Sequence, residues 1–303
     1  MKVKDTNFKK KEAQMRAGQT TLFQPLDISQ VAKKPRPNPL NEMDGSEWLR
    51  FTISWYIFDA LASDLDEEKA LMGNPEEHPA TFSPTMVSDY IRFFTKSGAT
   101  VLDPFVGIGS TLAACSRTGR RGIGLDINPE YCEMSRKRIN GDPNQQVIST
   151  NSFKIETLDL PQIDYCITSP PYFTMLNKID AAQRRKRIEK GLPTDYGVSI
   201  EGDFDTYISN LVTLFNKIAK LMPDKSYLTV ILQNFREKKK MIPLAWYLAI
   251  KLDKVGPWVF KGEKIWCQAH KSLYPYGQKF EFVSNVHHHY CLIFRKEGED
   301  EAD

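Results

Sequence analysis

The chain has 303 residues, 41% of them hydrophobic and 11% aromatic, which is enough apolar material for a sizeable core and excludes global disorder. The formal net charge of +3 identifies no partner by itself, and no apolar stretch approaches the ~20 residues that a membrane span requires. The five cysteines show no paired C-x-x-C spacing, which argues against disulfides and zinc ribbons, so we expect a soluble, cytoplasmic protein.

Both ends of the chain have the composition of solvated segments. Residues 1–45 are rich in lysine and contain a Pro-Arg-Pro-Asn-Pro stretch, which predicts a flexible basic arm. Residues 297–303 form an acidic tail. The folded domain is therefore expected to span residues 46–296, with the apolar residues 48–62 packed on its main body.

From residue 99 onward, predicted strands and helices alternate along the chain. Strands are predicted at 100–102, 122–126, 146–149, 165–168, 227–232, 260–266 and 290–294. Helices are predicted from about 110 to 117, from Pro129, through the apolar positions between Phe204 and Ile218, and near 244–252. This alternation is typical of a Rossmann-like, doubly wound α/β fold with a mostly parallel sheet.

A glycine-rich loop follows the first predicted strand of this sheet. Residues 103–111 read Asp-Pro-Phe-Val-Gly-Ile-Gly-Ser-Thr and lead into a helix, where glycines let a ligand approach the backbone. Leu112 stands where a dinucleotide fingerprint has its third glycine, which counts against NAD. The carboxylate of Asp103 suits a cationic ligand, and Asp126 at the end of the next strand suits ribose hydroxyls. The simpler alternative is that the glycines only form a tight turn and that Asp126 caps a helix.

A stiff turn follows the fourth predicted strand. Residues 168–173 read Thr-Ser-Pro-Pro-Tyr-Phe, and two consecutive prolines cannot continue a central strand. The turn offers a hydroxyl (Ser169), a carbonyl (Pro170) and an aromatic ring (Tyr172) at the ligand-binding edge of an open α/β sheet. Two acceptors that hold an exocyclic amine, with a ring that stacks on its base, would turn the nitrogen lone pair toward a methyl donor. A polyproline ligand for an SH3 or WW domain is the alternative interpretation.

Three segments together resemble motifs X, I and IV of the amino-methyltransferases of DNA, the N4-cytosine/N6-adenine family. They are 78–84 (His-Pro-Ala-Thr-Phe-Ser-Pro), the glycine loop and the turn at 168–172. Residues 126–131 and 285–296 resemble the segment after the second strand and the closing strand of that family. The resemblance implies a seven-stranded sheet of the S-adenosylmethionine-dependent methyltransferase type.

The resemblance also implies roles for individual residues. S-adenosylmethionine would be bound by nine of them: Thr81, Phe82, Asp103, Phe105, Gly107, Gly109, Ser110, Thr111 and Asp126. The target base would be surrounded by the catalytic turn, Ser169, Pro170, Pro171 and Tyr172. One departure concerns the adenine contact, because Asn151-Ser152 stand where the family often has an acidic residue.

The implied activity is direct transfer of a methyl group to an exocyclic amine of a flipped base, with no metal. Family members with serine before Pro-Pro mostly modify cytosine N4, whereas those with Asp or Asn mostly modify adenine N6, so N4 is expected and N6 is the alternative. The absence of a Pro-Cys pair argues against cytosine C5 chemistry, which needs a cysteine nucleophile. An RNA or protein methyltransferase, or a non-catalytic DNA-binding protein, are the alternatives of another class.

Two basic clusters are candidate contacts for the phosphates of double-stranded DNA. The insert 173–202 contains Arg184, Arg185, Lys186 and Arg187, and a second cluster contains Lys238 and Lys239. A solvated helix face is the alternative for both. Sequence readout is expected from the insert and from the aromatic and basic region 266–282.

Two short segments outside these motifs invite interpretation. Gln19-Thr20-Thr21-Leu22-Phe23 resembles peptides that bind bacterial sliding clamps, although a hydrophobic anchor is the simpler interpretation. His287, His288 and His289 are adjacent on a predicted strand and therefore point to alternate faces, which argues against one three-histidine metal site. The remaining expected partner is a cognate restriction endonuclease, and the expected location is the nucleoid.

Overall fold

A computed structural model describes residues 38–58, 64, 67, 82–171, 203–237, 240–268, 273–277 and 280–298. Several predicted features lie outside the described residues. They are the clamp-like segment 19–23, the insert 173–202, Thr81, Tyr172, Arg184, Arg185, Lys186, Arg187, Lys238 and Lys239. The structure therefore bears on most of the predicted cofactor site and on the first part of the catalytic turn.

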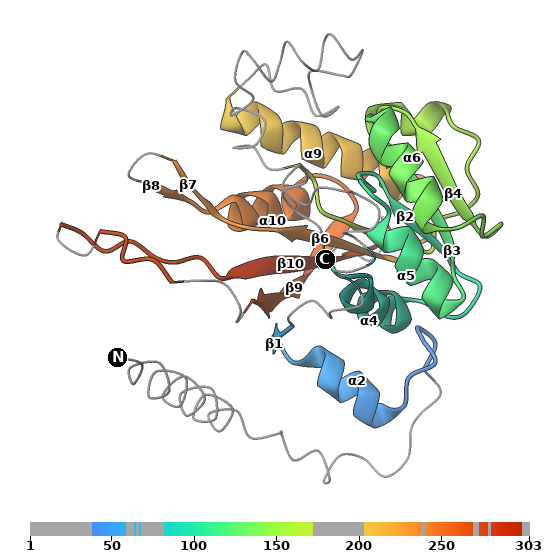
Figure 1. The fold of residues 1–303 in the computed structure, drawn as a ribbon, viewed down its shortest axis with the longest axis horizontal. Coiled ribbons are helices and arrows are strands. Elements are labelled where there is room, and N and C mark those ends of the chain that lie inside the picture. Colours follow the sequence, from blue (N-terminus) through green and yellow to red (C-terminus); the bar gives the residue numbers. More distant parts are fainter. Residues whose placement is uncertain are drawn as a thin grey trace, which may run out of the picture.

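One sheet of eight strands forms the centre of the described structure (Figure 1). Its strands follow the order β1-β9-β10-β6-β5-β2-β3-β4. Their bounds are β1 Trp55–Ile57, β2 Thr100–Asp103, β3 Arg121–Asp126, β4 Gln145–Ser149, β5 Tyr165–Thr168, β6 Tyr227–Leu232, β9 Trp258–Cys267 and β10 His288–Lys296. A separate antiparallel pair consists of β7 (Phe235–Glu237) and β8 (Lys240–Ile242).

Most neighbouring strands of the sheet are parallel. Strands β4, β3, β2, β5 and β6 run in one direction, and β10 lies antiparallel between β6 and β9. This arrangement confirms the predicted Rossmann-like, doubly wound α/β class. The sheet has eight strands and not seven, because β1 pairs in parallel with β9 at the edge.

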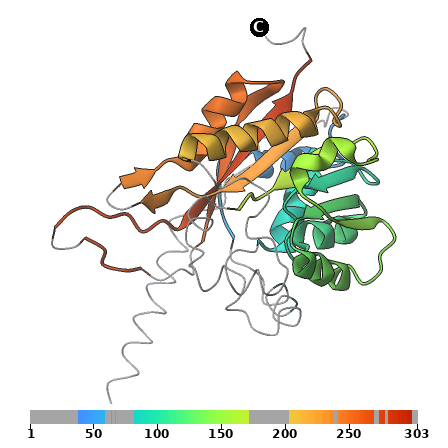
Figure 2. The same cartoon turned by 90° about the horizontal axis from the view of Figure 1, so that it is seen from above.

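Helices cover both faces of the sheet (Figure 2). Helices α4 (Pro84–Phe94) and α5 (Ser110–Thr118) share one apolar cluster with Val101 of β2 and Ile167 of β5. Helices α9 (Phe204–Ala219) and α10 (Leu244–Lys254) share a second cluster with Leu102 and Cys166 of the same two strands. Successive residues of a strand thus pack on opposite faces of the sheet, as the two-residue period of a strand requires. Helix α6 (Pro129–Arg138) and the 3-10 helix η2 (Ser152–Thr157) complete the described elements between β3 and β5.

The packed structure extends beyond the predicted limits at both ends. Asn41 is buried and donates to the carbonyl of Phe93, so residues before 46 already contact the body. Helix α2 (Gly45–Thr52) starts with a capping box formed by Asp44 and Glu47. At the other end, Glu297 is 6% exposed and pairs with Lys261. The packed part of the chain therefore starts before residue 46 and continues past residue 296, the limits that composition indicated.

Candidate active site

The glycine loop and the Ser-Pro-Pro turn leave the same edge of the sheet. Strands β2 and β5 are direct parallel neighbours, with Val101 opposite Tyr165 and Leu102 opposite Cys166. The chain leaves β2 toward α5 on one face of the sheet, and α9, which follows β5, covers the opposite face. This is the position at which open α/β sheets bind ligands, in the crevice outside the carboxyl ends of the strands.

A buried carboxylate ties these two segments together. Thr168, the last residue of β5, donates its Oγ1 proton to Oδ1 of Asp103 at 2.7 Å. Thr111 in the first turn of α5 donates to Oδ2 at 2.5 Å, and the amide of Phe105 donates to Oδ1 at 3.1 Å. Asp103 thus accepts bonds from β5, from α5 and from its own loop, and we call it the Asp103 clamp.

Burial sets the electrostatics of the clamp. Asp103 is 1% exposed, and removal from water raises the pKa of its carboxyl group to about 6, against the hydrogen bonds from Thr111 and Thr168, which lower it. Both of its carboxylate oxygens accept hydrogen bonds from within the protein. A contact between Asp103 and a cationic ligand, which the sequence suggested, stays a prediction.

The glycine loop is held from the neighbouring strand. Oδ2 of Asp126, the last residue of β3, accepts from the amide of Gly107 at 3.0 Å, and its Oδ1 accepts from the amide of Asn128 at 2.8 Å. Because a carboxylate oxygen accepts more than one hydrogen bond, these contacts are compatible with a ribose hydroxyl at Asp126. The alternative in which Asp126 only caps the next helix is not what the structure shows, since Asn128 is the cap of α6.

Gly109 needs to be glycine for two reasons. It adopts φ 88° at the start of α5, a left-handed conformation that L side chains rarely adopt, and a Cβ there would lie 2.4 Å from Oγ of Ser135. No side chain caps the first amides of α5. The helix therefore starts with backbone N–H groups beside the loop, which is the arrangement that accommodates a polar ligand.

The predicted cofactor residues fall into two groups by burial. The half-buried group comprises Phe82, Phe105, Gly107 and Asp126. The buried group comprises Asp103, Gly109, Ser110 and Thr111. The hydroxyl of Ser110 accepts from Arg138 at 3.1 Å, so this side chain also serves the internal structure. A ligand above the loop would meet the first group and the loop backbone.

The described part of the catalytic turn is anchored from α9. Ser169 and Pro171 are half-buried and Pro170 is buried. Tyr207, which is 2% exposed, donates its hydroxyl proton to the carbonyl of Pro171 at 2.9 Å. Sequence reasoning missed both Tyr207 and the role of Thr168, although Thr168 belongs to the quoted motif. Tyr207 occupies an apolar position of the helical pattern, and nothing in the sequence indicates that its hydroxyl group donates to a distant carbonyl.

The departure at Asn151-Ser152 has a local structural use. Asn151 accepts from the amide of Phe153 and so caps η2, whereas Ser152 donates to the carbonyl of Pro104 in the glycine loop. Ser152 therefore supports the glycine loop directly, whereas Asn151 supports the start of η2. Their effect on an adenine contact stays a prediction.

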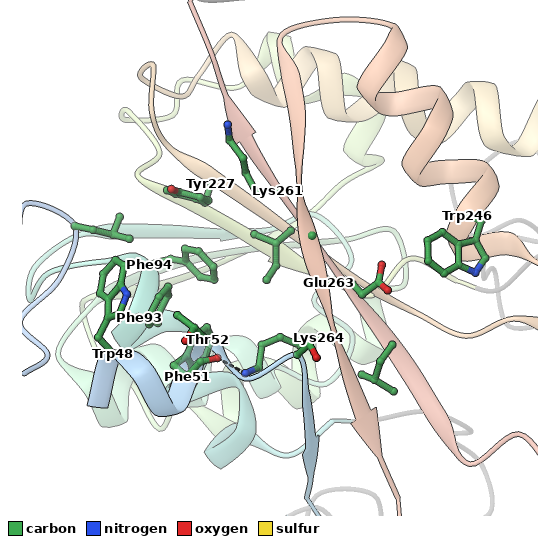
Figure 3. A pocket seen from close by; sticks show the side chains of 15 residues that line it. Trp48, Phe51, Thr52, Phe93, Phe94, Tyr227, Trp246, Lys261, Glu263 and Lys264 are labelled. Carbon is green, nitrogen blue, oxygen red and sulfur yellow. Dashed lines mark hydrogen bonds between the residues drawn. The ribbon is translucent and has the colours of Figure 1, made fainter. Parts of the chain in front are cut away.

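A separate cavity has a volume of about 620 Å³, and Figure 3 shows the side chains that line it. The aromatic residues that line it are Trp48 and Phe51 of α2, Phe93 and Phe94 of α4, Tyr227, and Trp246 of α10. Tyr227 is the first residue of β6, whereas the glycine loop and the catalytic turn follow the last residues of β2 and β5. This cavity therefore belongs to the amino end of the parallel strands and does not form part of the candidate site.

The adjacent histidines of β10 make separate contacts. His289 stacks on Trp266 with ring centroids 4.7 Å apart, and His288 meets Tyr290 edge-on at 5.0 Å. Within the described ranges, no group of three His, Cys, Asp or Glu side chains could hold a metal ion. The same part of the chain contains no helix that is long and apolar enough to span a bilayer.

Comparisons with known proteins agree with the motifs. Residues 3–137 match the family model for N6/N4 methyltransferases, described as DNA methylase. The match includes the glycine loop and ends before the catalytic turn. The chain is 38% identical over 71 residues to the type II methyltransferase M.HpaI of Haemophilus parainfluenzae, which is 23% of each chain. It is 39% identical over 66 residues to the type II methyltransferase M2.DpnII of Streptococcus pneumoniae, covering 22% of this chain and 25% of that one.

These sequence matches confirm the resemblance to the N4-cytosine/N6-adenine amino-methyltransferases. The chain spans about a quarter of the length of the curated relatives it matches. Among solved structures, TrmN from Thermus thermophilus aligns over 75% of this chain and 52% of its own, with 11% identity and a TM-score of 0.48.

Proposed function

We propose that this chain, which carries the motifs of the DNA amino-methyltransferases, transfers a methyl group from S-adenosylmethionine to the exocyclic amine of a base flipped out of double-stranded DNA. One observation carries the proposal: the hydrogen bond between Thr168 and Asp103, together with the parallel pairing of β2 and β5, keeps the glycine loop and the catalytic turn side by side. A methyl donor on one can reach an acceptor held by the other only in such an arrangement.

The described residues fit S-adenosylmethionine. Gly107 and Gly109 leave the loop backbone open to a ligand, and Asp126 stands at the end of the next strand, where a carboxylate can accept from ribose hydroxyls. The half-buried rings of Phe82 and Phe105 offer apolar contact. When bound, the cofactor supplies an electrophilic methyl group on a sulfonium, so no metal is needed for the transfer.

Two hydrogen-bond acceptors and an aromatic ring of the catalytic turn would then position the target base. Ser169 Oγ and the carbonyl of Pro170 would accept the two N–H bonds of the exocyclic amine and turn its lone pair toward the methyl group. The ring of Tyr172 would stack on the flipped base, a contact worth ~1–3 kcal/mol. The amine becomes cationic during transfer, and the same ring stabilises that charge. The bond from Tyr207 to Pro171 holds the turn in position.

Cytosine N4 is the target that we propose, because serine precedes Pro-Pro in this chain. Adenine N6 is the second candidate. Mass spectrometry of DNA digested after methylation separates the two, since the modified nucleosides differ in mass. Methylome sequencing of a host that expresses the chain would give the base, its position and the recognition sequence in one experiment.

A point variant tests the placement of the catalytic turn. Tyr172→Ala should abolish transfer and leave cofactor binding, measured by calorimetry, largely intact. Loss of both would show that the turn is misplaced. Transfer to tRNA or to a glutamine side chain, with no duplex modified, would favour an RNA or protein methyltransferase. Cofactor and duplex binding without turnover would favour a non-catalytic DNA-binding protein.

The remaining proposals concern partners. Arg184, Arg185, Lys186, Arg187, Lys238 and Lys239 would contact DNA phosphates, with a corresponding salt dependence. A restriction endonuclease of the same specificity and association with the nucleoid would follow from that activity. A peptide of residues 15–27 that fails to bind a bacterial sliding clamp would exclude the interaction through Gln19–Phe23.

A further inference from the structure

The connection between β9 and β10 exposes an unusual number of large apolar side chains. In the described residues 273–277 and 280–286, which we call the aromatic hairpin, Phe280 is 92% exposed and Phe282 is 90% exposed. Leu273, Tyr274 and Tyr276 are also more than half exposed. Single exposed apolar residues need no explanation, but five of them in one short connection mark an interaction site.

The hairpin has a defined shape. Asn285 fixes its base with two bonds to Tyr274: its Oδ1 accepts from the Tyr274 amide at 2.9 Å and its Nδ2 donates to the Tyr274 carbonyl at 2.8 Å. Near the tip, Gly277 adopts φ 69°, and a Cβ there would lie 2.3 Å from the carbonyl oxygen of Glu281. The exposed rings therefore project from a turn whose backbone is fixed by hydrogen bonds and by the conformation of Gly277.

The hairpin also starts from the edge of the sheet that carries the candidate active site. Strand β10 is antiparallel to β6, with Tyr290 opposite Leu232, so the first residues of β10 lie at the carboxyl end of β6. Gln233, directly after β6, donates to the carbonyl of His288 at 2.8 Å. Both views show the hairpin and the β7–β8 pair projecting from the same side of the molecule (Figures 1 and 2).

The amino-acid composition of the two projecting segments favours a polyanion as partner. The β7–β8 segment 236–240 has four cations and one acid, and the segment 268–287 contains Lys271 and Lys279 against Glu281. Aromatic side chains interleaved with cations are typical of nucleic-acid interfaces, where apolar side chains enter between base steps and cations meet phosphates. The other possible occupant is a second copy of this chain, which would need an acidic surface that fits the hairpin.

We propose that the aromatic hairpin enters double-stranded DNA beside the target base, with Phe280 and Phe282 as the inserted side chains. This inference rests on the proposed function, because it places the hairpin next to the base that is flipped out of the duplex for methylation. Insertion between base steps would offset part of the unpairing cost, since stacking on an aromatic ring replaces stacking within the duplex.

The test compares the parent protein with the double variant Phe280→Ser/Phe282→Ser. Ile250→Ser, which removes an exposed apolar side chain of α10 (56% exposed), is the matched control. Binding is measured by fluorescence anisotropy with a labelled 30-base-pair duplex of mixed sequence, and transfer is measured with radiolabelled cofactor on unmethylated genomic DNA, native and heat-denatured. Calorimetric cofactor binding and the melting temperature check that each variant is folded.

The expected result is at least about a tenfold loss of duplex binding and of transfer to native DNA, with a smaller loss on denatured DNA, unchanged cofactor binding and a normal control variant. Unchanged duplex binding by the double variant overturns the proposal. So does a change from dimer to monomer in light scattering with duplex binding unchanged, which would assign the hairpin to self-association. A parent that binds the duplex through these rings but modifies no DNA would refute the proposed function alone.

Discussion

Replacing Asp103 by asparagine should stabilise the protein at neutral pH. Burial raises the pKa of the Asp103 carboxyl group from 3.8 to about 6, and two pKa units correspond to about 3 kcal/mol. The folded protein holds this proton more tightly than the unfolded chain, so stability falls as the pH rises from about 4 to about 6. Above that range the ionised, buried carboxylate costs the folded state the full amount.

Asparagine keeps the geometry of the clamp without the charge. Its oxygen can accept from Thr168 and from the amide of Phe105, and its NH₂ group can donate to the hydroxyl of Thr111. The expected gain in the free energy of unfolding is therefore up to about 3 kcal/mol at pH 7.5 and about 1 kcal/mol at pH 4.5. Asp103→Ala, which leaves three donors without an acceptor, should destabilise instead.

Urea unfolding of the parent and the variant at several pH values measures this difference. Asp126→Asn is the matched control, because that carboxylate is only half-buried and should give no such gain. A variant that is less stable than the parent at pH 7.5 would refute the reasoning. Calorimetry adds a functional readout: a positioning role leaves the Kd for S-adenosylmethionine within about threefold, whereas a direct contact with its ammonium group would cost tenfold or more.

Three further variants test single contacts. Gly109→Ala should lower the melting temperature and weaken cofactor binding, because it combines a left-handed φ with a Cβ 2.4 Å from Oγ of Ser135; a stable variant with normal binding would contradict the loop geometry. Tyr207→Phe removes the bond to the Pro171 carbonyl, so kcat should fall while the cofactor Kd and the fold persist, at a stability cost of about 1 kcal/mol. Burial lowers the pKa of Lys264 to about 8, so the parent should gain stability as the pH rises from about 8 to 10, and Lys264→Met should lose that rise in thermal melts.

The strands that position the site were predictable from local pattern. Strands β5 and β6 have the predicted bounds, because a polar residue stands at each end of both buried runs. Helix α4 was missed although Ser83 caps it and Pro84 occupies its first turn, a recognised start signal. Of this helix, only Pro84 belongs to a segment that the sequence analysis interprets, the motif at 78–84.

Other features depend on contacts that no local pattern encodes. Strand β1 has three residues, and its pairing with β9 joins Trp55 to Ile265 across more than 200 positions. The Asp103 clamp is of the same kind, because Asp103 and both threonines stand in the quoted motifs but the hydrogen bonds between them cannot be read from the sequence. Composition assigned residues 1–45 to the arm, whereas Asn41 is buried by a contact with Phe93 on α4. Long-range pairing and burial decide such cases, and a window of neighbouring residues contains neither.

The order of the strands divides the ligand edge into regions. Asp126 and the glycine loop belong to β3 and β2 on one side, the catalytic turn follows β5 in the middle, and β6 and β10 carry the two projecting hairpins on the other side. A cofactor over β2 and β3 and a duplex held by the hairpins would therefore meet over β5. On the proposed function, a flipped base would have to travel only from the hairpins to the adjacent strand, and the Asp103 clamp would keep that strand in register with the glycine loop. On this reasoning, weakening the clamp should impair transfer more than it impairs the binding of either substrate.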